Sequence, residues 1–263
     1  MSSIVTDHGV VHYEVTGRGL PVILLHGWIG SWGYWVDTMA CLEDRYRGYA
    51  LDFWGFGDSD KRRNSFSISD FVSLVDQFMD RLGIESAPVI GHSMGGTVAL
   101  SLALTNPKRV KQVVVVGSPI AGNSLNIFLQ LAGKSQIATL LWKFPFFLQT
   151  FLKWYSPFVT RASQDWYKMV MRDISATTLE SFFSSIRSLY HTDLTPRLAD
   201  INVPTFGIYG RSDVIVSPYQ GKLLNQYIKG SEVTMLSESG HFPMLDEPEL
   251  FNHHLLDFLD RTL

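Results

Sequence analysis

A serine flanked by glycines is the first feature of the chain that could do chemistry. The run Gly91-His92-Ser93-Met94-Gly95-Gly96 follows a short apolar stretch and precedes a segment with helical spacing. A sharp turn from a strand into a helix crowds the backbone, and Gly91 and Gly95 supply the small residues that such a turn needs on either side of Ser93. The Ser93 hydroxyl would then stand at the tip of the strand, near the positive end of the following helix. The alternative is a glycine-rich turn in which the serine is incidental.

A serine nucleophile needs a base, and the base needs a carboxylate that orients it. Asp213 follows a predicted strand at 205–209, and His241 follows another at 233–236. The chain order Ser, Asp, His is that of catalytic triads whose serine stands on a strand-to-helix turn. We therefore predict a triad of Ser93, Asp213 and His241. The alternatives are a turn-forming aspartate and an ordinary loop histidine.

A serine that attacks a carbonyl carbon also needs donors for the oxyanion that forms. One predicted donor is the backbone N–H of Met94, directly after Ser93. The other is the backbone N–H of Trp28, in the loop His26-Gly27-Trp28 that follows an apolar run at 22–25. Gly27 would permit the backbone turn that aims the Trp28 N–H inward. Alternatively, the loop is a plain strand-ending turn in which Trp28 only packs.

These residues require a scaffold in which strands and helices alternate. Continuous apolar runs predict strands buried on both faces, and apolar residues at helical spacing predict the helices between them. The predicted strands are 10–15, 22–25, 47–51, 87–90, 113–116, 205–209 and 233–236, and the predicted helices are 69–82, 93–105, 219–227 and 248–259. Ser67 or Ser69 could cap the helix at 69–82, and Gly83 could end it. The alternation implies a mostly parallel sheet with helices on both faces.

Residues 120–197 break this rhythm, because they have helical and aromatic character without a convincing buried strand. We predict that they form a helical cap inserted into an α/β core of residues 1–119 and 198–263. Open α/β sheets bind ligands at the carboxyl ends of their strands. The cap is therefore expected to pack over that end of the sheet.

The composition limits the partners. The chain has 263 residues, is 46% hydrophobic and carries a formal net charge of -3, which gives ample material for a core and argues against a nucleic-acid partner. The N-terminal residues do not resemble a secretory signal, and no run has the length and purity of a transmembrane segment. We expect a cytoplasmic protein. Its one cysteine, Cys41, excludes an intramolecular disulfide, and we interpret it as a small buried side chain.

The remaining histidines do not indicate a metal. His8, His12, His191, His253 and His254 show no metal-ligand spacing with cysteines or carboxylates. His92 is expected to pack or hydrogen-bond beside the nucleophile. We therefore predict no metal and no organic cofactor.

Five segments taken together resemble the α/β-hydrolase superfamily. They are Leu25 to Trp28, Asp52 to Ser59, Gly91 to Gly96, Gly210 to Asp213 and Gly240 to Pro243. The resemblance implies an eight-stranded sheet, a helical cap and a supporting, non-chemical role for Asp52, Gly55, Gly57 and Ser59. Within the superfamily the chain looks most similar to serine carboxylesterases, including the biotin-pathway esterases that share a tryptophan after His-Gly.

Other members of that superfamily differ at positions that decide the reaction. Dehalogenases and epoxide hydrolases attack with aspartate where this chain has Ser93. Hydroxynitrile lyases carry lysine, and ring-cleavage C–C hydrolases carry tryptophan, after the catalytic histidine, where this chain has Phe242. We expect a serine hydrolase that cleaves small-molecule carboxylic esters through an acyl-enzyme. The alternatives are a C–C hydrolase of vinylogous diketones, a cofactor-free haloperoxidase and a hydrolase-like small-molecule receptor with slow turnover.

Charge is distributed unevenly along the chain. Between Glu85 and Asp165 there is no acidic residue, but there are seven bases: Lys108, Arg109, Lys111, Lys134, Lys143, Lys153 and Arg161. The last four interleave with Leu140, Leu141, Trp142, Phe144, Phe146, Phe147, Phe151, Trp154, Tyr155 and Phe158. We predict that the aromatic side chains line an acyl pocket and that the bases help to dock an acidic acyl carrier protein or an anionic surface. A helical cap with solvated lysines would explain the aromatic residues without any partner.

Overall fold

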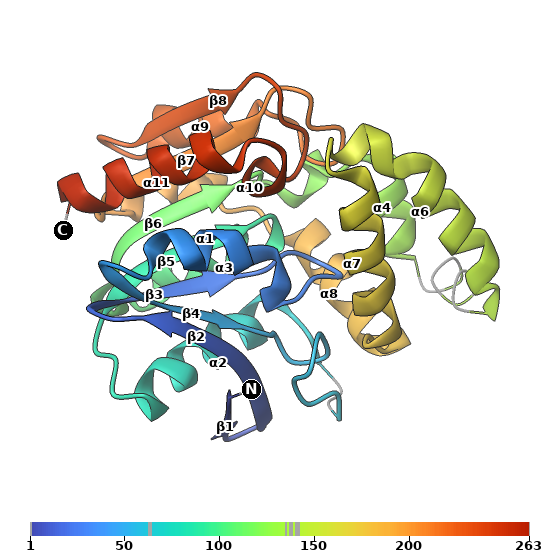
Figure 1. The fold of residues 1–263 in the computed structure, drawn as a ribbon, viewed down its shortest axis with the longest axis horizontal. Coiled ribbons are helices and arrows are strands. Elements are labelled where there is room, and N and C mark those ends of the chain that lie inside the picture. The colour runs from blue at the N-terminus through green and yellow to red at the C-terminus, as the bar shows by residue number, and fades with distance from the viewer. Residues whose placement is uncertain (1, 63–64, 135, 137–138, 140–142, 263) are drawn as a thin grey trace.

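The computed structural model describes residues 2–62, 65–134, 136, 139 and 143–262, which include an eight-stranded sheet (Figure 1). The strand order is β1-β2-β4-β3-β5-β6-β7-β8. Strand β2 runs antiparallel to β1 and β4, and the other neighbouring pairs are parallel. The strands are β1 (Ser2–Thr6), β2 (Gly9–Gly17), β3 (Leu20–Leu25), β4 (Tyr46–Leu51), β5 (Ala87–His92), β6 (Val110–Val116), β7 (Thr205–Gly210) and β8 (Glu232–Leu236). The predicted mostly parallel eight-stranded sheet is confirmed.

The described helices lie between and after these strands. They are α1 (Val36–Leu42), α2 (Ile68–Arg81), α3 (Met94–Thr105), α4 (Ile127–Ala132), α6 (Pro145–Val159), α7 (Ser163–Ser175), α8 (Leu179–His191), α9 (Gln220–Tyr227), α10 (Pro243–Asp246) and α11 (Pro248–Thr262). Short 3₁₀ helices add η1 (Trp32–Trp35), η2 (Pro107–Arg109), η3 (Gly122–Ser124) and η4 (Thr195–Asp200).

Helices cover both faces of the sheet because successive side chains of a strand point to opposite faces. In β3, Ile23 and Leu25 belong to a core cluster that α2, α3 and α9 share, whereas Val22 and Leu24 belong to a second cluster with α1 and α11. Strand β6 alternates in the same way. This double burial explains why the central strands are continuous apolar runs in the sequence.

Seven strands match the predicted runs, and the eighth, β1, was not predicted from the residues. Its side chains are mostly half-buried or exposed, and it pairs only with β2 at the edge of the sheet. Helix α1 was also missed. The interpretation of Cys41 as a buried side chain is wrong, because Cys41 is exposed on α1.

Residues 120–197 supply α4, α6, α7 and α8, and Figure 1 shows these helices together at one end of the sheet, beyond the tip of the β6 arrow. An isolated antiparallel bridge pairs Ala121 with Asp193, so the two ends of this segment lie side by side. That pairing agrees with an insertion bounded near 120 and 197, and the division itself stays a prediction. Among the helices that the structure describes, none is both long and apolar enough to cross a membrane.

Helix α2 begins where its capping residue predicts. Ser67 is the N-cap: its side chain accepts a hydrogen bond from the Asp70 backbone N–H at 3.2 Å, while the Asp70 carboxylate accepts one from the Ser67 N–H at 2.8 Å. Gly83 follows the helix at a φ of 68°, in the left-handed region that favours glycine.

We expect Ser67→Ala to lower the free energy of unfolding by about 1 kcal/mol, because one backbone donor at the helix start loses its acceptor. Urea unfolding of the purified variant measures the change. Ser69→Ala is the matched control, since Ser69 is not the N-cap, and it should change stability by less than about 0.5 kcal/mol. Equal losses in both variants would mean that the cap does not hold this helix.

Candidate active site

Ser93 occupies the sharp turn between β5 and α3 that its sequence context predicts. Its φ is 50° and its ψ is −118°, and within the described residues Ile29 is the one other non-glycine with a positive φ. Such a conformation costs on the order of 1–3 kcal/mol, so the surroundings must hold it. The Ser93 N–H donates to the Val116 carbonyl oxygen at 2.8 Å, which ties the turn to the end of β6. Ser93 is 6% exposed.

The glycines beside Ser93 are required by close backbone approach. A Cβ atom on Gly91 would collide with the Gly95 backbone, and one on Gly95 would collide with the Leu25 carbonyl at the end of β3. A Cβ on Gly27 would lie 3.1 Å from the Ser93 Cβ. The loop after β3 therefore packs directly against the serine turn.

Asp213 and His241 are brought together although they belong to loops after different strands, β7 and β8. The His241 Nδ1 lies 2.8 Å from the Asp213 Oδ2, and both side chains are buried. The other carboxylate oxygen, Oδ1, accepts the backbone N–H groups of Ile215 at 2.8 Å and Val216 at 2.9 Å. A carboxylate held in this way only accepts hydrogen bonds, so Nδ1 carries the proton and Nε2 is left as an acceptor.

His92 hydrogen-bonds to the backbone of His241. This agrees with the expectation that His92 packs or hydrogen-bonds beside the nucleophile. Its Nε2–H donates to the His241 carbonyl oxygen at 2.9 Å. The His241 N–H donates to the Val159 carbonyl oxygen, at the end of α6, at 2.8 Å. Burial lowers the pKa of His92 well below its usual value, and the nearby His241 adds to this effect. A neutral His92 therefore fixes the His241 backbone without competing for the Asp213 charge.

The predicted oxyanion donors lie on either side of Ser93. Met94 is the first residue of α3, so its N–H has no acceptor within the helix. The backbone N–H of Trp28 has no acceptor among the described residues, and the Trp28 indole N–H donates to the Phe182 carbonyl oxygen of α8 at 2.9 Å. His26 fixes this loop: its Nε2 accepts the Phe53 N–H at 2.9 Å, and its Nδ1–H donates to the Gly27 carbonyl at 2.7 Å.

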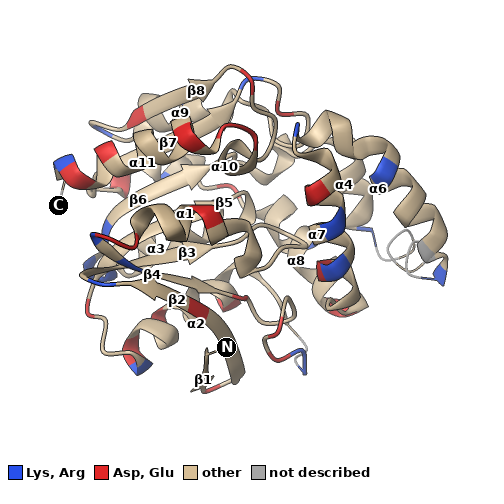
Figure 2. Cartoon of the chain, in the orientation of Figure 1, with Lys and Arg blue, Asp and Glu red and all other residues tan. Residues whose placement is uncertain are grey.

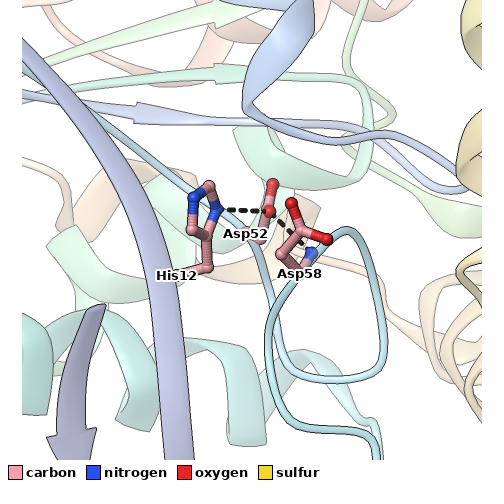
Figure 3. Close-up of side chains that lie close together, drawn as sticks. All are labelled: His12, Asp52 and Asp58. Atoms are coloured by element: carbon pink, nitrogen blue, oxygen red, sulfur yellow. Dashed lines mark hydrogen bonds and ion pairs between the residues drawn. The ribbon is translucent and has the colours of Figure 1, made fainter. Parts of the chain in front are cut away.

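Asp52 joins the two loops that support the site. Its Oδ1 accepts the Trp32 N–H at 2.7 Å, and its Oδ2 accepts the Asp58 N–H at 2.9 Å and contacts the His12 Nδ1 at 2.9 Å (Figure 3). The Ser59 hydroxyl donates to the Asp52 carbonyl at 2.7 Å. These bonds agree with the supporting role that the resemblance implies for the Asp52 to Ser59 loop.

His12, Asp52 and Asp58 also form the one group of described residues whose ligand atoms lie close enough, within 4.8 Å, to hold a metal ion. Sequence spacing could not reveal it, because His12 and Asp52 come from different strands. The Asp52 oxygens already accept two N–H groups, and the hydrogen bond to Asp52 raises the pKa of His12 despite its burial. We interpret the cluster as a hydrogen-bonded support.

Two carboxylates, one buried and one half-buried, connect α6 and α7 with the site. The sequence analysis did not identify either of them. Asp246 accepts the Gly240 N–H at 2.7 Å and the Arg161 N–H at 2.7 Å, so it joins the His241 loop to the end of α6. Asp173, on α7, accepts the Ser31 hydroxyl at 3.1 Å. Burial raises the pKa of Asp173 to about 6.

A cavity of about 400 Å³ opens in front of Ser93 and His241. Its described lining contains no lysine, arginine, aspartate or glutamate, and its polar side chains are few. The lining residues are Trp28, Ile29, Tyr34, His92, Ser93, Asn126, Phe128, Leu129, Leu131, Ala132, Phe147, Leu148, Phe151, Leu152, Tyr155, Val159, Trp166, Val170, Phe182, Ile186, Leu189, Ile215, His241 and Phe242. The size and apolar lining are those of a small-molecule site.

Of the cap aromatic residues expected to line a pocket, Phe147, Phe151 and Tyr155 do so. Phe144, Phe146, Trp154 and Phe158 are instead at least half exposed and do not line the cavity. Leu140, Leu141 and Trp142 lie outside the described residues. The predicted aromatic lining is thus confirmed for Phe147, Phe151 and Tyr155 and is wrong for the four exposed rings.

The model of the alpha/beta hydrolase fold family matches residues 21–248. The chain therefore belongs to the α/β-hydrolase family and is an enzyme of the hydrolase class. Similar proteins include a putative carbamate hydrolase of Azorhizobium caulinodans, 27% identical over 94% of each chain. They also include a pimeloyl-(acyl-carrier protein) methyl ester esterase of Nitrosomonas europaea, 26% identical over 92% of this chain and 96% of its own. A third is a 2-hydroxy-6-oxo-6-phenylhexa-2,4-dienoate hydrolase of Comamonas testosteroni, 27% identical over 95% and 91%.

The His12–Asp52 contact should make stability depend on pH. The folded-state pKa of His12 is raised, mainly by its hydrogen bond to Asp52, so protonated His12 stabilises the fold fully below its unfolded pKa. That contribution is lost as the pH rises through the raised value. We expect His12→Phe to cost about 1–3 kcal/mol near pH 6 and less near pH 9.

Urea unfolding at the two pH values measures this difference. His253→Phe is the matched control, because His253 is exposed on α11, and its effect should be small at both. A His12→Phe loss that stays constant from pH 6 to 9 would contradict a charged contact with Asp52.

Proposed function

We propose that this chain hydrolyses neutral, apolar carboxylic esters through an acyl-enzyme on Ser93. The cavity would lie between an α/β core of residues 1–119 and 198–263 and a helical cap of residues 120–197. One observation carries the proposal: Ser93 and the Asp213-bound His241 border the same cavity, and no Lys, Arg, Asp or Glu is among its described lining residues. We assign the triad and the oxyanion donors from this arrangement.

In the proposed reaction the Ser93 Oγ attacks the ester carbonyl carbon while the His241 Nε2 takes its proton. The oxyanion accepts hydrogen bonds from the backbone N–H groups of Met94 and Trp28. The alkoxide leaves with the proton from His241, and the acyl group stays on Ser93. A water molecule then gives its proton to His241 and attacks the acyl carbon. The bond from the acyl carbon to the Ser93 Oγ breaks, His241 returns the proton to Oγ, and the acid is released. Asp213 keeps the imidazole in the required tautomer and stabilises the imidazolium.

The lining of the cavity argues for a neutral substrate. The Comamonas testosteroni relative acts, by its name, on a dienoate, which carries a carboxylate. A buried carboxylate needs a cation or several donors, since burying an unpaired charge is costly. The cavity offers no lysine or arginine among its described residues, and His92, whose pKa is lowered, is neutral. This favours ester hydrolysis over C–C cleavage of a carboxylate-bearing diketone.

A fluorophosphonate probe should label Ser93 rapidly, because the probe reacts with activated serines. Ser93→Ala should fold normally and lose both labelling and ester turnover. Asp213→Asn should lower kcat by roughly a thousandfold or more, because the wrong imidazole tautomer is then stabilised. Ser237→Ala, at an exposed serine just after β8, is the control and should label like the wild type. Peptide mapping that finds the fast label on another serine would overturn the assignment.

Acyl chain length should tune the rate. Each methylene that enters the apolar cavity adds roughly 0.8 kcal/mol of binding, so kcat/KM of p-nitrophenyl esters should rise about fourfold per methylene until the cavity is full. An ester of the same length that ends in a carboxylate should react about a hundredfold more slowly.

Steady-state rates over such a panel of esters test both expectations. A preference for the carboxylate-bearing ester would contradict the neutral cavity. Tight binding with only a few turnovers per protein on every ester would instead support the slow receptor.

A further inference from the structure

Large apolar side chains crowd the outer surface of α4 and α6. Seven of them are between 46% and 70% exposed, and we call this set the aromatic patch: Ile127, Phe128, Phe144, Phe146, Phe147, Trp154 and Phe158. Single exposed apolar residues are ordinary on protein surfaces, but a contiguous group of this kind marks a site of interaction. Ring contacts join Phe144 and Phe146 to Phe147 near the start of α6, and Trp154 to Phe158 near its end.

Helical spacing places part of the patch in a stripe that leads into the cavity. Phe147, Phe151, Trp154 and Phe158 follow one another at intervals of four, three and four, which puts them on one side of α6. Phe128 contacts Phe151 at a centroid distance of 5.2 Å and so joins α4 to this stripe. Phe128 and Phe147 are 46% and 66% exposed and also line the cavity. The apolar surface and the apolar cavity are therefore continuous.

The charge around the patch is positive. Lys134, Lys143 and Lys153 are exposed and form no ion pair with any described residue. Figure 2 shows blue but no red on α6, whose one charged residue is Lys153. Not every base of the acid-free segment belongs to this surface: Arg161 pairs with Glu238, and Arg109 pairs with Asp76 and Asp80. Of the four cap bases expected to help docking, Arg161 is thus paired within the fold, and three lysines are left for a partner.

The exposed rings and the unpaired lysines together fit one kind of partner. An acidic protein would pair with the lysines but would leave most of the exposed rings in water. A second copy of the chain, bound through the same patch, would bring the unpaired lysines of both copies together. A bilayer interface accepts apolar and aromatic side chains, among which tryptophan is favoured, and anionic headgroups attract flanking lysines.

We propose that the aromatic patch docks this protein on the surface of an anionic lipid bilayer. The exposed rings of α4 and α6 enter the boundary between headgroups and acyl chains, and Lys134, Lys143 and Lys153 contact the phosphates. Docking in this position faces the cavity entrance toward the lipid, from which an apolar ester could enter. The docking goes beyond the proposed function and does not need a working triad, so Ser93→Ala should bind vesicles like the wild type.

Vesicle flotation tests the proposal with the full chain. The wild type should float with vesicles of phosphatidylcholine mixed with phosphatidylglycerol, and less with phosphatidylcholine alone. Raising the salt should weaken binding to the mixed vesicles, because the screening length is only ~10 Å at 0.1 M. The double variants Trp154→Ser/Phe158→Ser and Lys143→Glu/Lys153→Glu should each bind at least about tenfold more weakly. None of these four residues lines the cavity, so hydrolysis of a short soluble ester should be unchanged.

Matched controls sit far along the chain from the patch. Tyr219→Ser removes an aromatic side chain that is 55% exposed, and Lys229→Glu reverses an exposed lysine; both should bind vesicles like the wild type. The proposal is overturned if the wild type does not float with the mixed vesicles, or if the patch variants float as well as the controls do. It is also overturned if the aromatic patch binds an acidic acyl carrier protein instead of lipid. A dimer of the chain that Trp154→Ser disrupts would overturn it as well.

Discussion

The positive-φ turn at Ser93 is the constraint on which the rest of the site depends. The tight turn brings backbone segments so close that a Cβ atom added at Gly91, Gly95 or Gly27 would collide with a neighbouring residue. Strand β5 lies between β3 and β6, and the loops after these two strands are the ones that can pack against the turn. The strand order thus determines that the Trp28 loop lies on one side of Ser93. The Asp213 and His241 loops, which follow β7 and β8, lie on the other.

The helices that follow β6 do more than cover this arrangement, because several residues of the site form hydrogen bonds with them. The His241 N–H donates to the carbonyl of Val159, and the indole of Trp28 donates to the carbonyl of Phe182. Asp173 binds the loop at Ser31. A wholesale movement of these helices would break such bonds and disturb both His241 and the loop that contains Trp28.

The sequence could predict those parts of the structure whose signal lies in residues close together in the chain. Strands β3 and β6 are buried on both faces and are readable as apolar runs, whereas the half-exposed edge strand β1 carries no such run. Ser93 could be found because its glycines are adjacent to it, and Asp213 and His241 because each follows a strand. Asp246 and Asp173 could not, since their partners at Arg161 and Ser31 are distant in the sequence and ordinary in type. The Glu238 partner of Arg161 escaped notice for the same reason.

The aromatic residues of α6 show a second limit of prediction from the sequence. Both sides of this helix are apolar, so its period could not tell which rings face inward, and the structure divides them between the cavity and the surface. The rings that line the cavity and the rings on the surface therefore serve different purposes. A cavity without lysine, arginine or carboxylates in its described lining selects by shape and apolarity, since a buried charge would find no partner there. Any selection by charge must then act outside, where Lys143 and Lys153 remain in solvent and an anionic surface can be attracted at little desolvation cost.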